Sequence, residues 1–156
     1  MRVDSIIGGK TITDTIKAPW HLWAVGAVAV LFNAFGAYDH FMHLMQGPSY
    51  MASMGMTPEQ VAYIEGYPMW MMVVWATGVW TAFVGSLLIL LRKKPAFPLF
   101  ALSLAAYLVN LLYTYVLTNG GEILGQSMVI ISIVITAELA FLIWYARAMT
   151  TRGVLR

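Results

Sequence analysis

The sequence contains no cysteine, and only 10% of its 156 residues are charged, against about 25% in a typical soluble domain. Without cysteine there is no disulfide framework, no thiolate nucleophile and no thiolate ligand for an iron–sulfur cluster. The chain also lacks a glycine-rich phosphate loop, a His-Glu-x-x-His zinc motif and a serine in a nucleophile-elbow context. These absences predict a protein that is not an enzyme.

Lysine and arginine are missing from residues 46–67 and 119–123, and nowhere do they form a patch with interleaved aromatic residues. Nucleic acid is therefore not an expected partner. What the chain has in abundance is apolar side chains, since 60% of its residues are hydrophobic. A chain this short cannot bury so much apolar surface within itself, so a lipid bilayer is the predicted surrounding.

Four apolar stretches are long enough to cross a bilayer, which takes about 20 helical residues. They predict an all-α fold, an integral membrane four-helix bundle with spans over about 19–45, 68–91, 97–118 and 124–148. Residues 1–18 and 150–156 are then extramembrane tails. Within the loop at 46–67, Thr57 followed by Pro58 and Gln60 has the pattern of a capped helix start. This pattern predicts a short helix over 58–65, lying at the membrane interface.

All nine lysine and arginine residues fall on one side of this four-span arrangement. Three precede the first span, three separate the second span from the third, and three lie at the end of the fourth span or beyond it. Basic residues of membrane proteins concentrate on the cytoplasmic side. Both termini are therefore predicted to be cytoplasmic, and the loop at 46–67 is predicted to face the outside.

Three polar side chains fall near the middle of the predicted membrane, namely Asn33, Asn110 and Glu138. At about 1.5 Å per residue their depths are similar, so both asparagines are expected to meet Glu138 at the bundle centre. A carboxylate at that depth costs about 3 kcal/mol or more unless it is paired or protonated. Two interpretations stay open: a proton or cation site on a transport pathway, and a protonated glutamic acid whose hydrogen bond locks the helices together.

A second polar cluster, at the far end of the first span, contains Asp39, His40 and His43. Asp39 and His43 are four residues apart and share a helix face, so we expect them to form an outer polar gate. Eight of the 11 methionines lie between residues 42 and 72. Thioether and imidazole groups suit copper, which makes His40, His43, Met42 and Met45 a candidate copper site. The alternatives are an interfacial hydrogen-bond cluster for the histidines and a gap-filling role for the methionines.

Several stretches resemble a family of small four-helix inner-membrane proteins of proteobacteria. These stretches are residues 32–39, Tyr50-Met51, 57–60, 75–80, Gly85-Ser86 with the leucines and basic residues after it, and 144–147. The similarity extends over nearly the whole chain from Trp20 on. It implies a multi-pass protein of the bacterial inner membrane, and the label "sugar transporter" that members often carry implies transport. The family pattern includes Tyr38, Asp39, Met42 and Met51, but neither His40 nor His43.

Three functions follow from these observations. The first is a small-solute (sugar-like) or proton-linked transporter, with Glu138 as the pathway residue, that acts as an oligomer because four helices form a thin pathway. The second is a non-catalytic accessory or assembly subunit of a larger membrane complex. It is supported by Trp70, Trp75 and Trp80 on the second span, which are more tryptophans than one interface needs. The third is periplasmic-side copper binding through the Met/His cluster. Transport ranks first.

Overall fold

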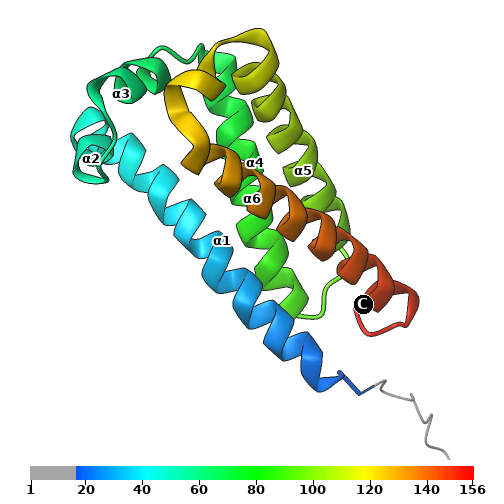
Figure 1. The fold of residues 1–156 in the computed structure, drawn as a ribbon. Helices are drawn as coiled ribbons and strands as arrows, with labels where there is room; N and C mark the ends of the chain where they lie inside the picture. The colour runs from blue at the N-terminus through cyan, green and yellow to red at the C-terminus, as the bar shows by residue number, and fades with distance from the viewer. Residues whose placement is uncertain (1–16) are drawn as a thin grey trace, which may run out of the picture.

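The computed structural model describes residues 17–156, so most of the predicted N-terminal tail lies outside the described residues. Four long helices run along the length of the molecule, and two short helices lie together at one end (Figure 1). The long helices are α1 (Trp20–Gln46), α4 (Met69–Leu90), α5 (Ala96–Leu112), which a π-helical turn continues over Tyr113–Leu117, and α6 (Gly120–Thr151). The short helices are α2 (Pro48–Ser53) and α3 (Pro58–Glu65).

The predicted fold class is confirmed, since four of the described helices are long and apolar enough to cross a membrane. Their bounds differ from the predicted spans by a few residues at most. The short helix predicted over 58–65 is α3, and its start is the expected capping box. The Thr57 hydroxyl accepts from the Gln60 amide at 3.3 Å, and the Gln60 side chain accepts from the Thr57 amide at 3.0 Å. Helix α2 was not predicted; Pro48 opens it, at a position where proline suits a helix.

The long helices form a bundle around one core, to which all four contribute. Helix α1 packs along α4, α4 along α5, and α5 along α6, whereas α6 and α1 share no extended backbone contact. The α4–α5 pair is close because small residues meet there, with the Ser103 hydroxyl donating to the Gly78 carbonyl at 2.7 Å. Helices α1 and α6 instead meet through side chains: the Nδ1 atom of His21 lies 2.6 Å from the Tyr145 hydroxyl, and Leu22 shares the core with Leu142.

The apolar core lies toward the C-terminal end of the bundle, the end that also carries the α4–α5 turn. Its fully buried members include Leu22, Ile89, Phe100 and Leu142. Beyond α6 the chain folds back onto this end, where Val154 and Leu155 are buried and the Arg156 amide donates to the Arg92 carbonyl at 2.8 Å. The segment predicted as a basic tail, residues 150–156, thus forms the last helical turn and a cap under the bundle.

Helix α6 is broken near its start by Gly125, whose φ of 77° and ψ of 179° are not helical. A break of this kind frees carbonyl groups from the helical hydrogen-bond ladder, and those groups need other donors. The Gln60 side-chain amide of α3 donates to the carbonyls of Ile123 and Leu124, at 3.2 Å each. Helix α3 therefore holds the first turn of α6, and through it the position of the long segment that follows.

Replacing Gln60 by glutamate tests this attachment. The variant keeps a side-chain oxygen for the Thr57 capping box, and it replaces the donor to Ile123 and Leu124 by a carboxylate oxygen that faces their carbonyls. Losing these two hydrogen bonds is expected to make the amides of residues 123–127 exchange with solvent deuterium about tenfold faster, as for a loss of about 1.4 kcal/mol. Hydrogen-exchange mass spectrometry in detergent measures this, and unchanged exchange in these residues would contradict the attachment.

Candidate functional site

The mid-bundle polar site is built around Asn33 of α1, which faces α4 and α6 at once. Its Nδ2 atom lies 2.8 Å from Glu138 Oε1, 3.1 Å from Ser86 Oγ and 2.9 Å from the Ala29 carbonyl. The Ser86 hydroxyl donates in turn to the Ala82 carbonyl at 2.8 Å. Asn33 is only 8% exposed, so these contacts fix its amide in place. The structure brings Asn33 and Glu138 together as expected, and it adds Ser86.

The second carboxyl oxygen of Glu138 has no partner. Glu138 Oε2 is buried and makes no hydrogen bond with any described residue. A buried polar atom without a partner is costly, and in a native protein it usually has a reason, such as a functional role or an unseen ligand. Asn33 thus holds one oxygen of the carboxyl group, and the other oxygen is buried without a donor from any described residue.

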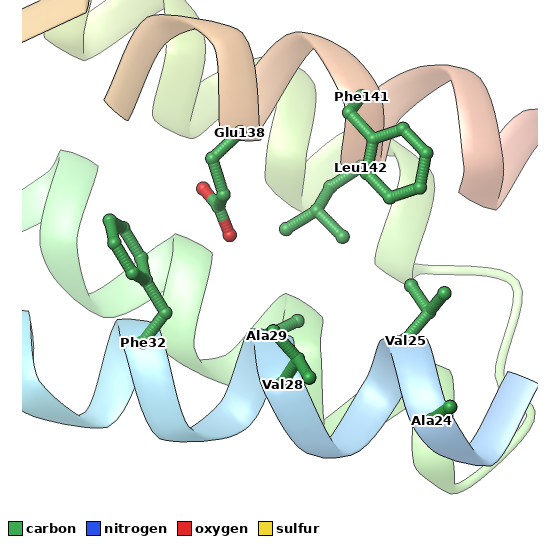
Figure 2. Close-up of a pocket in the computed structure, with 8 residues that line it drawn as sticks. All are labelled: Ala24, Val25, Val28, Ala29, Phe32, Glu138, Phe141 and Leu142. Atoms are coloured by element: carbon green, nitrogen blue, oxygen red, sulfur yellow. The ribbon is translucent and has the colours of Figure 1, made fainter. Parts of the chain in front are cut away.

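Glu138 lies beside a cavity of about 290 Å³ between α1 and α6, and Figure 2 shows its carboxyl group pointing toward α1. The seven other lining residues are all apolar: Ala24, Val25, Val28, Ala29, Phe32, Phe141 and Leu142. The cavity is open at its side, where Val28 is 68% exposed. We call this cavity the α1–α6 groove. In a bilayer its open side faces lipid acyl chains.

Asn110 was predicted as a further partner of Glu138, and it is not one. No hydrogen bond between described residues joins Asn110 to Asn33 or to Glu138, because Glu138 faces α1 rather than α5. The α6 side chain that reaches the helix carrying Asn110 is Ser132, whose hydroxyl lies 3.1 Å from that of Tyr115. Ser132 and Glu138 point in directions about 120° apart around the helix, at about 100° per residue. Asn110 and Glu138 therefore lie at a similar depth in the bundle, but their side chains do not face each other.

The predicted gate pair, Asp39 and His43, does not form. The Asp39 carboxylate instead accepts from the hydroxyl of Tyr50 on α2, at 3.0 Å. Burial, followed by this hydrogen bond, raises the pKa of Tyr50 to about 12, so Tyr50 is protonated at physiological pH and remains the donor. The contact ties α2 to the end of α1, while the His43 ring turns toward α4.

His40 and His43 both pack against Trp75 of α4, and each imidazole ring has its centroid 4.9 Å from that of Trp75. The Nδ1 atoms of both histidines are buried without a hydrogen-bond partner. Met45 lies on the exposed side of α1, 67% exposed and about 200° around the helix from His43. The four predicted copper ligands are therefore not gathered at one point, and the described residues contain no group of three or more histidine, aspartate or glutamate side chains placed to hold a metal.

Four apolar helices of membrane-spanning length, with polar side chains turned inward, define a multi-pass integral membrane protein. Comparison of the chain with models of known protein families finds no match. Comparisons with curated proteins and with solved structures find none either. The resemblance to small inner-membrane proteins of proteobacteria therefore stays a prediction, and the site itself is the basis for any functional proposal.

Proposed function

We propose that the protein is a transporter of the bacterial inner membrane, which moves a small solute in a cycle linked to protonation of Glu138. One observation carries the proposal: a carboxyl oxygen without a partner, Glu138 Oε2, lies beside a cavity that opens toward the bilayer. A carboxyl group placed only to lock the helices would be expected to use both of its oxygens, whereas here one stays free.

The proposed cycle follows from the cost of charge inside a membrane. An ionised carboxylate at this depth is unfavourable unless a proton or a bound group neutralises it. The carboxyl group therefore exchanges a proton for a solute. The ionised carboxylate with neither a proton nor a solute bound is rarely populated. Asn33 fixes the carboxyl and Ser86 fixes Asn33, so the free oxygen keeps one orientation during the exchange. Helices α1 and α6 meet through side chains rather than through close backbone contact, so a movement of α6 relative to α1 would have to rearrange side chains but not a tight backbone interface.

The orientation of the chain is part of the same proposal, with both termini in the cytoplasm. It is supported by the seven described lysine and arginine residues, Lys17, Arg92, Lys93, Lys94, Arg147, Arg152 and Arg156, which all belong to the C-terminal end of the bundle. Hydrogen bonds between residues 92–94 and 154–156 join two of these basic segments directly. We also propose that the transporter acts as an oligomer, since four helices alone form a thin pathway.

A second candidate is an accessory or assembly subunit of a larger membrane complex. It is favoured by α6, which buries the smallest share of its apolar window among the four spans, 17% against 22–28%. A partner helix that lies along α6 would cover this face and fill the α1–α6 groove. Stable, stoichiometric co-purification with a larger protein, unaffected by the loss of the Glu138 carboxyl, would favour this candidate over transport.

Labelling with dicyclohexylcarbodiimide, a hydrophobic reagent that attacks protonated carboxyl groups, tests the proposed function. We expect the reagent to modify Glu138 in membrane vesicles at low pH, and we expect the yield to fall as the pH rises and the carboxyl ionises. Intact-mass and peptide mass spectrometry measure the modification. The variant Glu138→Gln should take up no label at this position.

Glu122 provides the matched control, because it lies on the same helix and is exposed. The variant Glu122→Gln should be labelled at Glu138 as the unmodified protein is, and a water-soluble carbodiimide should reach Glu122 far better than Glu138. If dicyclohexylcarbodiimide leaves Glu138 unmodified at every pH, the carboxyl is never both protonated and reachable from lipid, and the proposed function is wrong.

A further inference from the structure

We infer that the solute is a lipophilic monovalent cation, which enters the α1–α6 groove from the bilayer and pairs with the Glu138 carboxylate. This inference rests on the proposed function and names the substrate class of the same site. It narrows the solute to a molecule with an apolar body and a single positive charge, such as an organic ammonium or phosphonium ion.

The sign of the charge follows from the groups that face Glu138. Asn33 faces it from α1, and Ser86 of α4 acts only through Asn33. None of the seven other lining residues is titratable. The basic residue of α6 next along the chain, Arg147, is nine residues away, or about 13 Å along the axis. A carboxylate with no cation nearby attracts a positive group and repels an anion.

The lipophilic character follows from the lining. A sugar or a hydrated metal ion gives up many hydrogen bonds to water on binding, and a site for either supplies many polar atoms in return. Glu138 is the single polar residue that lines the groove, and the other lining residues carry aliphatic or phenyl side chains. Phe32 and Phe141 add ring faces, which also attract cations. The volume of about 290 Å³ is at the lower end of the range for drug-sized ligands.

The exchange conserves charge. One monovalent cation takes the place of one proton on Glu138, so the site is neutral both before and after the exchange. The released proton goes to solvent, and the cation leaves when a proton returns. Protons and cations thus compete for one carboxyl group, which predicts that cation binding strengthens as the pH rises and weakens as it falls.

Equilibrium dialysis of the purified full-length protein with radiolabelled tetraphenylphosphonium tests the inference. At pH 8 the unmodified protein is expected to bind the probe at least about 30-fold more tightly than Glu138→Gln, the loss typical of removing one member of a desolvated charge pair. Glu122→Gln should bind as the unmodified protein does. Ala24→Trp, which fills the groove from an exposed position, should weaken binding while leaving the carboxyl intact.

Tetraphenylborate, an anion of nearly the same shape and hydrophobicity, shows whether binding depends on the positive charge of the probe. Equal binding of the two probes, or equal binding of tetraphenylphosphonium by the unmodified protein and Glu138→Gln, overturns the cation inference. The carbodiimide result then decides the wider question. Labelling of Glu138 without binding of tetraphenylphosphonium means that the substrate class is wrong and the proposed function stands, whereas absence of both means that both are wrong.

Discussion

Replacing Asn33 by leucine is expected to lower the free energy of unfolding by about 3 kcal/mol, because both oxygens of the Glu138 carboxyl then lie in the bundle without a partner. Leucine has the same number and branching of side-chain heavy atoms as asparagine and is somewhat larger, so the change leaves no empty space. The Ser86 hydroxyl also loses the donor that now points at it. Unfolding in mixed detergent micelles, followed by circular dichroism, measures the loss.

The converse substitution separates the two interpretations of Glu138. Glu138→Leu should leave stability nearly unchanged or slightly improved, because Asn33 keeps Ala29 and Ser86 as acceptors and no carboxyl remains to be neutralised. Combining Asn33→Leu with Glu138→Leu should recover at least half of the stability lost in Asn33→Leu, since removing both members of a buried polar pair is often nearly neutral. A loss in Glu138→Leu as large as in Asn33→Leu would mean that Glu138 serves to lock the helices.

Asn110 offers the control for this cycle. It lies at a similar depth, and no hydrogen bond of the described residues connects it to the Asn33–Glu138 pair. Asn110→Leu is therefore expected to change the free energy of unfolding by no more than about 0.5 kcal/mol. A large effect there would show that stability responds to any polar group removed from this layer, and the special place given to Asn33 would be wrong.

These three residues also show how far the sequence could predict the site. Depth along a helix follows from counting residues, so Asn33 and Glu138 were correctly placed in one layer. Rotation about the helix axis does not follow from counting, because it depends on which helices are neighbours. The sequence suggested a bundle in which Asn110 also points to the centre. In the structure, α6 turns Ser132 toward α5 and Glu138 toward α1.

Elsewhere in the structure, features that depend on neighbouring residues could be predicted, and features that depend on distant segments could not. The α3 capping box was predictable because Thr57 and Gln60 are three residues apart and interact locally. Ser86 was a missed partner, although a lone serine in a leucine-rich span is itself a signal for a hydrogen bond across helices. Tyr50 competes successfully for Asp39 because the unpredicted helix α2 folds back on α1. The α1–α6 groove, formed by two helices at opposite ends of the chain, had no signal in the sequence.

Adding a single methyl group at Gly125 is also expected to lower the free energy of unfolding substantially. Its φ of 77° and ψ of 179° lie in a region of backbone conformation that is essentially restricted to glycine. Gly125→Ala should therefore lower the free energy of unfolding by up to about 3 kcal/mol. Crowding is not the cause, because a Cβ atom built at Gly125 meets no other atom within 4 Å. The cost arises from the backbone alone, and thermal unfolding in detergent measures it.

Gly36 provides the matched control, since a Cβ atom there also meets nothing within 4 Å, and its backbone is helical. Gly36→Ala should raise stability by about 0.5–1 kcal/mol, the usual difference between alanine and glycine within a helix. If alanine at 125 instead straightens α6, the first turn of that helix must leave Gln60, and residues 123–127 should exchange faster, as in Gln60→Glu. Equal stability of the two alanine variants, with unchanged exchange, would mean that the break at Gly125 neither requires glycine nor determines where α3 holds α6.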